Sequence, residues 1–181
     1  MRKLARMVYG TKYRIISTIA VIAIISSGIF FFSNNIQSRE VRDRTWLSYG
    51  VIDNIVRPTS PEELSEVVAS SPGPIAVAGA RYSQGGQTWA QNATVIDIRD
   101  LNRILDLDIP GKQITVETGI TWREILEVIS PLGLSIRVMQ SYYDFTVGGA
   151  LSVNAHGRDT TGSIVKTVKH IKVLLPDGSY V

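Results

Sequence analysis

Residues 15 to 32 form an apolar run that divides the chain into two unlike parts. The run, IISTIAVIAIISSGIFFF, contains no charged residue. As an α-helix it would be about 27 Å long, close to the hydrocarbon thickness of a bilayer. A buried helix of a globular domain would show a polar face, whereas this run shows only scattered Ser and Thr. We therefore predict a single transmembrane helix at residues 15–32, with the lipid bilayer as its partner.

A cleavable signal peptide is the alternative interpretation of the same run. Its apolar region would normally span about 7–15 residues and end in a cleavage site of small residues. The residues after Phe32, SNNIQSRE, offer no such site, so an uncleaved anchor is favoured. Five basic residues and no acidic one precede the run. This charge pattern predicts a cytoplasmic tail at residues 1–14 and a domain outside the cytoplasm.

The charge of the chain lies mainly in its N-terminal arm. Residues 1–44 carry eight Lys and Arg against two acidic residues, so 11 basic and 14 acidic residues remain in 45–181. A nucleic-acid-binding domain needs a basic face of its own, and we expect no nucleic-acid partner. The chain has no cysteine, which excludes disulfides, thiolate catalysis and cysteine-ligated metals. We predict no metal site.

The rest of the chain alternates helical and strand patterns. Residues 33–48 are polar and charged and predict a tether, followed by a domain at 49–181. Ser60 and Thr121 are the expected N-caps of two helices, because each is followed three residues later by a glutamate that can complete a capping box. The second helix is expected to stop near Pro131.

Short β-type runs lie around these helices and predict an α+β fold. They are PIAVAG (74–79), ATVIDI (93–98), KQITVE (112–117), LSIRV (134–138) and VKHIKVLL (168–175). The final residues, PDGSYV, predict a turn into a strand that has barely begun at Val181. Because such a strand leaves its partner's edge unpaired, we expect the chain to be a fragment truncated at its C-terminus.

The first of two glycine-bearing motifs is VAGARYSQGGQT, which begins at Val77. A loop rich in backbone N–H groups after a strand can surround phosphate oxygens, and glycine lets the ligand approach the backbone. The motif matches neither GxGxxG at a helix start nor GxxxxGK[ST]. Taken alone, a glycine-rich loop of this kind is more often an ordinary turn.

The second motif is TVGGALSVNAHGRD, residues 146–159. Gly148 and Gly149 predict a tight turn feeding a short helix of small residues. The N-terminus of that helix would present free N–H groups and a positive dipole end to an anion. His156 follows the helix, and a structural histidine bonded to backbone is its alternative interpretation.

Together these motifs, and the segments VIDIRDLNRIL and VETGITWREILEVISPLGLSIRV between them, closely resemble the PCMH-type FAD-binding domain of the p-cresol methylhydroxylase/vanillyl-alcohol oxidase superfamily. Within it the sequence is most similar to the sugar oxidases, which include aldonolactone and alditol oxidases and decaprenylphosphoryl-ribose 2′-oxidases. The resemblance covers residues 50 to 181. It implies that the 77–87 loop cradles the FAD diphosphate and that the TVGGAL segment lies along the flavin.

The resemblance assigns cofactor contacts residue by residue. The implied FAD ligands are Ala78, Gly79, Ala80, Arg81, Tyr82, Ser83, Gln84, Gly85, Gly86, Gln87, Ser141, Thr146, Val147, Gly148, Gly149, Val153, Asn154, Ala155 and His156. Tyr142 and Tyr143 could stack on flavin or adenine, or serve only as packing residues.

Two departures from the family pattern refine this expectation. Many relatives attach FAD covalently to a histidine at the position of Tyr82, so we predict non-covalent FAD here. The substrate domain of the family has no counterpart in the chain, and no residue is assigned as catalytic.

The resemblance implies the FAD-binding portion of a membrane-anchored oxidoreductase that oxidises a CH–OH group of a sugar, polyol or aldonolactone. Two alternatives stay open. One is a non-catalytic, flavin-binding or membrane-tethered module. The other is a flavoenzyme similar to the UDP-N-acetylenolpyruvoylglucosamine reductases.

Overall fold

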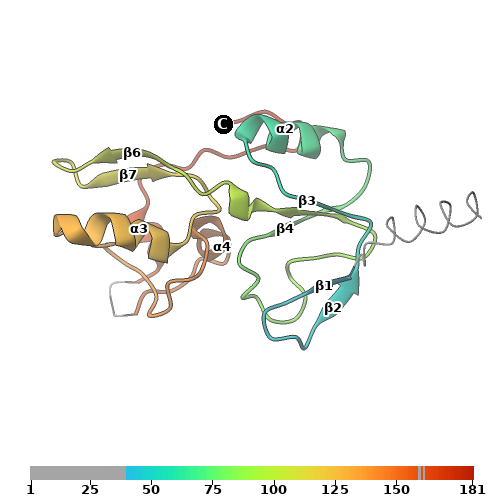
Figure 1. Ribbon diagram of the computed structural model, residues 1–181, viewed down its shortest axis with the longest axis horizontal. Coiled ribbons are helices and arrows are strands. Elements are labelled where there is room, and N and C mark those ends of the chain that lie inside the picture. Colours follow the sequence, from blue (N-terminus) through green and yellow to red (C-terminus); the bar gives the residue numbers. More distant parts are fainter. Residues whose placement is uncertain (1–39, 159, 161) are drawn as a thin grey trace, which may run out of the picture. The chain divides into compact units, whose positions relative to one another are not determined.

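The computed structural model describes residues 40–158, 160 and 162–181 (Figure 1). This part of the chain mixes helices and strands, as predicted. None of its helices has both the length and the apolar character needed to cross a membrane. The predicted tail at 1–14 and the predicted transmembrane helix at 15–32 lie outside the described residues.

The domain begins earlier than predicted. Strand β1 (Glu40–Arg42) pairs antiparallel with β2 (Tyr49–Val51). In the turn between them Asp43 is buried and accepts hydrogen bonds from the amide and hydroxyl of Thr45, at 2.9 and 2.6 Å. The prediction of a tether through residue 48 is therefore wrong for residues 40–48. Their polar composition is misleading because Asp43 faces inward while its charged neighbours face solvent.

A three-stranded parallel sheet forms the centre of the first half of the domain. Its strands are β3 (Asn54–Val56), β4 (Ile75–Ala78) and β5 (Thr94–Asp97), in the order β3-β5-β4. The apolar residues of β5 are buried, because β5 lies between β3 and β4 at the centre of the sheet. Since parallel strands end at the same edge, the segments after all three strands meet there, where ligands of open α/β sheets usually bind.

Helix α2 (Pro61–Ser70) connects β3 to β4 and begins at the predicted cap. The Ser60 hydroxyl accepts a hydrogen bond from the Glu63 amide at 3.1 Å. The predicted capping box is only half formed, because the Glu63 carboxylate accepts from the Thr59 amide at 2.8 Å instead of from Ser60.

The second half of the domain packs an antiparallel hairpin against a helix. Strands β6 (Ile104–Asp108) and β7 (Gln113–Val116) lie along helix α3 (Trp122–Ile129) in Figure 1. The buried face of α3 consists of Trp122, Ile125 and Ile129, and the apolar side chains of the hairpin pack on the same cluster. The capping box of Thr121 and Glu124 is complete, as predicted.

Helix α4 (Val147–Ser152) follows, and three 3₁₀ turns cover Ile98–Asp100, Ser130–Leu132 and Ile164–Thr167. Two predicted strands are wrong. Residues 134–138 form no ladder, and the amide and carbonyl of Val138 both bond the Thr167 hydroxyl at 2.9 Å.

Residues 168–175 form no regular strand, and a bridge joins Leu174 to Tyr180. The predicted turn at 176–181 does form, since Val173 and Val181 exchange backbone hydrogen bonds of 2.8 and 2.9 Å. This hairpin packs on α2, where the Tyr180 hydroxyl donates to the Pro61 carbonyl oxygen at 2.8 Å.

Candidate cofactor site

The loop after β4 has an unusual backbone. Arg81 has a φ of 59°, and Gly85 and Gly86 have φ values of 94° and 85°. Within the described residues, the backbone amides from Ala80 to Gln84 donate to no protein acceptor. Successive unbonded N–H groups in such a loop are suited to surround an anion.

The turn between β1 and β2 holds this loop. The Arg44 amide donates to the Arg81 carbonyl oxygen at 2.9 Å. The Gly85 amide points to Oδ2 of Asp43 at 3.4 Å. The hydrogen bond from the Thr45 hydroxyl lowers the pKa of Asp43 from its ordinary value, so this acceptor is a carboxylate at neutral pH.

The start of α4 differs from the prediction. Gly148 and Gly149 lie inside the first helical turn and do not form a turn before it. The amides of Val147 and Gly148 donate to the carbonyl oxygens of Ile120 and Thr118 at 2.8 and 2.9 Å. The Gly149 amide points to the Thr146 hydroxyl at 3.3 Å. The expectation of free N–H groups here is wrong, because the carbonyl oxygens of residues 118 and 120 and the Thr146 hydroxyl accept from them.

The two predicted motifs meet directly in space. A Cβ atom placed on Gly79 would overlap Oγ1 of Thr146, so only a glycine lets the backbone at 79 approach the Thr146 side chain so closely. The Tyr82 ring packs edge-on against Tyr142 and Phe145, with centroid distances of 5.1 and 5.0 Å. The loop after β4 and the segment before α4 therefore form one surface.

The hydroxyl groups of Tyr82 and Tyr142 lie 2.8 Å apart. This hydrogen bond, assisted by Asp144, raises the pKa of Tyr142 to about 12. Its hydroxyl is therefore neutral at physiological pH. Arg44 lies over the Tyr82 ring at 5.2 Å and covers a further side of the cluster.

Other predicted ligands are not brought to the loop. His156 is exposed, and its Nδ1 lies 2.8 Å from the Gly157 carbonyl oxygen, which matches the backbone-bonded alternative. Ala155 is buried in the core around Ile164. Ser141, Val153 and Asn154 are exposed, and within the described chain no hydrogen bond joins them to residues 79–87.

Two buried side-chain donors in the described part of the chain have no acceptor. They are Nε of Arg81 and Nε1 of Trp89, and both belong to the segment that carries the loop. A buried donor left unbonded costs about 1–3 kcal/mol. Donors without acceptors, beside free backbone amides, fit an anionic cofactor whose oxygens supply the acceptors.

One cluster at this edge has no counterpart in the sequence prediction. The Asp97 side chain ends β5, is 2% exposed, and lies within 4 Å of Arg57, Arg81 and Arg99. Burial opposes its ionisation, but the hydrogen bonds from Arg99 prevail and hold the pKa of Asp97 below its ordinary value. The signal that could have indicated this site is an aspartate at the end of an apolar strand.

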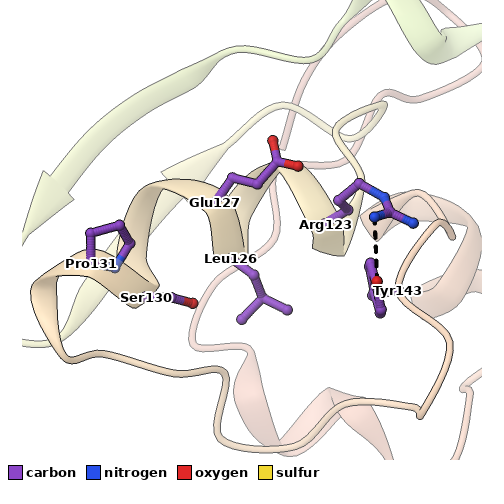
Figure 2. Close-up of a pocket in the computed structure, with 6 residues that line it drawn as sticks. All are labelled: Arg123, Leu126, Glu127, Ser130, Pro131 and Tyr143. Carbon is purple, nitrogen blue, oxygen red and sulfur yellow. Dashed lines mark hydrogen bonds between the residues drawn. The ribbon is translucent and has the colours of Figure 1, made fainter.

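A separate pocket of about 390 Å³ lies on α3. Figure 2 shows Arg123 and Tyr143 facing one another across one end, with the guanidinium 4.2 Å from the ring centroid. Its lining residues are Arg123, Leu126, Glu127, Ser130, Pro131 and Tyr143. None of them belongs to the loop after β4.

Comparison with known proteins identifies the family. Residues 52–181 match the model of a family described as an FAD binding domain. Decaprenylphosphoryl-beta-D-ribose oxidase of Mycolicibacterium smegmatis is 29% identical over 100 residues, which are 51% of this chain and 22% of the relative. A probable L-gulonolactone oxidase 6 of Arabidopsis thaliana is 27% identical over 132 residues, 68% of this chain and 22% of the relative.

The L-gulonolactone oxidase of Bos taurus is also 27% identical over 132 residues, 70% of this chain and 30% of the relative. The chain thus spans less than a third of the length of these curated relatives. The family match nevertheless covers most of the chain, and the donors of the loop after β4 fit the diphosphate of the expected cofactor. The resemblance to PCMH-type domains is confirmed: the chain belongs to the FAD-binding domain family, and its cofactor is FAD.

Proposed function

We propose that this chain is the FAD-binding part of a membrane-anchored flavin oxidoreductase that oxidises a CH–OH group of a sugar, polyol or aldonolactone. Relatives named as oxidases of decaprenylphosphoryl-β-D-ribose and of L-gulonolactone support the donor class. The observation that carries the proposal is the contact of Gly79 with Thr146, which joins the two motifs of the FAD-binding family into one surface.

Each part of this surface has a separate role in holding the cofactor. The free amides from Ala80 to Gln84 bind diphosphate oxygens. The ring cluster of Tyr82, Tyr142 and Phe145 offers an apolar wall that excludes water beside the cofactor. When bound, FAD supplies the two-electron redox chemistry, while the protein orients it and sets its surroundings.

Tyr82 is a poor residue for covalent attachment of the flavin. A tyrosine nucleophile must lose its proton, which requires a base beside its hydroxyl. The Tyr82 hydroxyl shares a hydrogen bond with the Tyr142 hydroxyl, and no base contacts Tyr82 within the described residues. His156, the other candidate, is engaged with backbone through Nδ1.

The test uses the FAD-loaded oxidoreductase of which this chain is the proposed FAD-binding part, because the chain alone spans less than a third of the length of its curated relatives and is expected to be inactive by itself. The yellow protein should lose its colour under anaerobic conditions when L-gulono-1,4-lactone or a similar donor is added. Acid precipitation should leave the colour in the supernatant, because the attachment is non-covalent. Bleaching by NADPH but not by any lactone or polyol would favour a reductase. FAD binding without bleaching by either would favour a non-catalytic module, and flavin fluorescence on a denaturing gel would contradict non-covalent binding.

The membrane anchor is a second, separable element of the proposal, and it rests on the uncharged run at 15–32 and the five basic residues before it. A reporter that is active only outside the cytoplasm, fused after Val181, should be active. The protein should also stay in membranes during an alkaline carbonate wash. Activity of a cytoplasm-only reporter would reverse the orientation, and release by the wash would remove the anchor.

A further inference from the structure

Three arginines meet at the carboxyl edge of the parallel sheet. Arg57 follows β3, Arg81 lies in the loop after β4, and Arg99 follows β5. All three approach the same buried carboxylate, that of Asp97. The strand order β3-β5-β4 explains this, since it places the end of β5 between the ends of the other two strands.

The three guanidinium groups are not equally neutralised. Arg99 binds Asp97 with two short hydrogen bonds, Nε to Oδ1 at 2.8 Å and Nη2 to Oδ2 at 2.6 Å. Arg57 has a partner of its own, Asp100, at 3.0 Å. Arg81 makes a single contact with Asp97, from Nη2 to Oδ2 at 3.4 Å. Three cations thus share two carboxylates, and Arg81 is the one with the weakest partner.

Arg81 is also the most buried of the three. Its side chain is 21% exposed, against 49% for Arg57 and 43% for Arg99. Its Nε has no acceptor within the described residues. Burial lowers the pKa of Arg81 from its ordinary value, although Asp97 opposes the change. A partly buried guanidinium with one long ion-pair contact and an unbonded Nε is energetically costly unless an anion binds beside it.

The backbone of Arg81 carries strain as well. Its φ of 59° is in the left-handed region, which a residue with a long side chain rarely adopts. Such conformations are energetically costly and cluster at ligand sites. The left-handed turn keeps the side chain of Arg81 at Asp97 while the free amides from Ala80 to Gln84 lie in the same loop.

We propose that the Arg81 guanidinium binds an anionic diphosphate oxygen of FAD, and that Asp97, locked by Arg99, is the positioning residue that holds Arg81 for this contact. Guanidinium–phosphate hydrogen bonds are charge-assisted and geometrically specific. The inference rests on the proposed FAD site. It adds the Arg81 guanidinium to that site, held in place by the buried Asp97 carboxylate, which does not itself bind the cofactor.

The test compares Arg81→Met with the matched control Arg57→Met, using the full chain and titrating FAD and ADP. Both variants lose one positive charge beside Asp97, but Arg57 is exposed and paired with Asp100. Arg81→Met should weaken both ligands about ten- to a hundredfold, the value expected for a lost charged hydrogen bond. Arg57→Met should weaken them less than threefold, and Arg81→Lys should recover part of the loss.

Asp97→Asn tests whether Asp97 acts by holding the Arg81 guanidinium in place or only through its negative charge. The substitution removes a negative charge near the bound anion, so long-range electrostatics alone would make ADP bind more tightly. Positioning predicts weaker ADP binding. Tighter or unchanged binding by Asp97→Asn, in a protein that keeps its fold, would overturn the role of Asp97.

Equal losses in Arg81→Met and Arg57→Met, or no loss in Arg81→Met, would overturn the role of Arg81, and these two variants decide that point even if Asp97→Asn does not fold. A wild-type chain that binds neither FAD nor ADP would instead overturn the proposed function itself.

Discussion

Gly79→Ala is expected to weaken FAD binding at least a hundredfold. The new methyl group would overlap Oγ1 of Thr146, whose side chain is buried and caps α4. Thr146 is 2% exposed and its hydroxyl caps α4 through the Gly149 amide, so turning it away would break that cap, and we expect the loop after β4 to move away from α4 instead. The free amides and the ring cluster would then no longer form one surface. A hundredfold loss corresponds to about 2.8 kcal/mol of binding free energy.

The measurement is titration of flavin fluorescence, with Gly73→Ala as the control. A Cβ on Gly73, just before β4, has its nearest neighbour at 4.0 Å, so this variant should bind FAD as the wild type does. Adding Thr146→Ala to Gly79→Ala should restore part of the affinity, because it removes the overlapping hydroxyl and leaves the Thr146 Cβ at 3.3 Å. Wild-type affinity in Gly79→Ala would show that FAD does not need this contact.

Gly119→Ala is expected to destabilise the fold by about 3 kcal/mol or more, at the upper end of the effects of overpacking. A Cβ there would overlap the Ile98 carbonyl oxygen and lie 2.8 Å from that of Leu101. Both obstacles are backbone atoms. The Leu101 carbonyl cannot retreat, because it accepts the Gly119 amide at 2.8 Å.

Urea denaturation followed by circular dichroism measures this effect. Gly73→Ala again serves as the matched control and should change the free energy of unfolding by less than about 0.5 kcal/mol. A Gly119→Ala protein within about 1 kcal/mol of the wild type would mean that the 98–101 turn yields, and that it contributes little to the stability of the domain.

Local signals in the sequence predicted much of the fold. The helix starts at Ser60 and Thr121 were predictable because a cap depends on residues only three positions apart. The strands at 134–138 and 168–175 were predicted wrongly because an apolar, β-branched run becomes a strand only when a partner strand lies beside it. Here the Thr167 hydroxyl takes the place of a partner for Val138.

The candidate site was only partly predictable for the same reason. The resemblance indicated the loop after β4, and the structure places Gly79 against Thr146 of the second motif and Tyr82 against Phe145, just before that motif. The cluster at Asp97 could not be inferred, because Arg57, Arg81 and Arg99 become neighbours only through the strand order. The amides of α4 looked free in the sequence because nothing local indicates that the carbonyl oxygens at 118 and 120 bind them.

The order of the parallel sheet also dictates the sequence of events when the chain is synthesised. The central strand, β5, is the last of the three to leave the ribosome, so β3 and β4 emerge without a hydrogen-bonding partner. The loop after β4, which contains Arg81, is synthesised before β5, the strand that contains the Asp97 carboxylate. A nascent chain that has reached residue 93 therefore has two strands without a hydrogen-bonding partner and a loop whose Arg81 has no carboxylate beside it. Completion of Thr94–Asp97 gives both strands their hydrogen-bonding partner and brings the Asp97 carboxylate to Arg81.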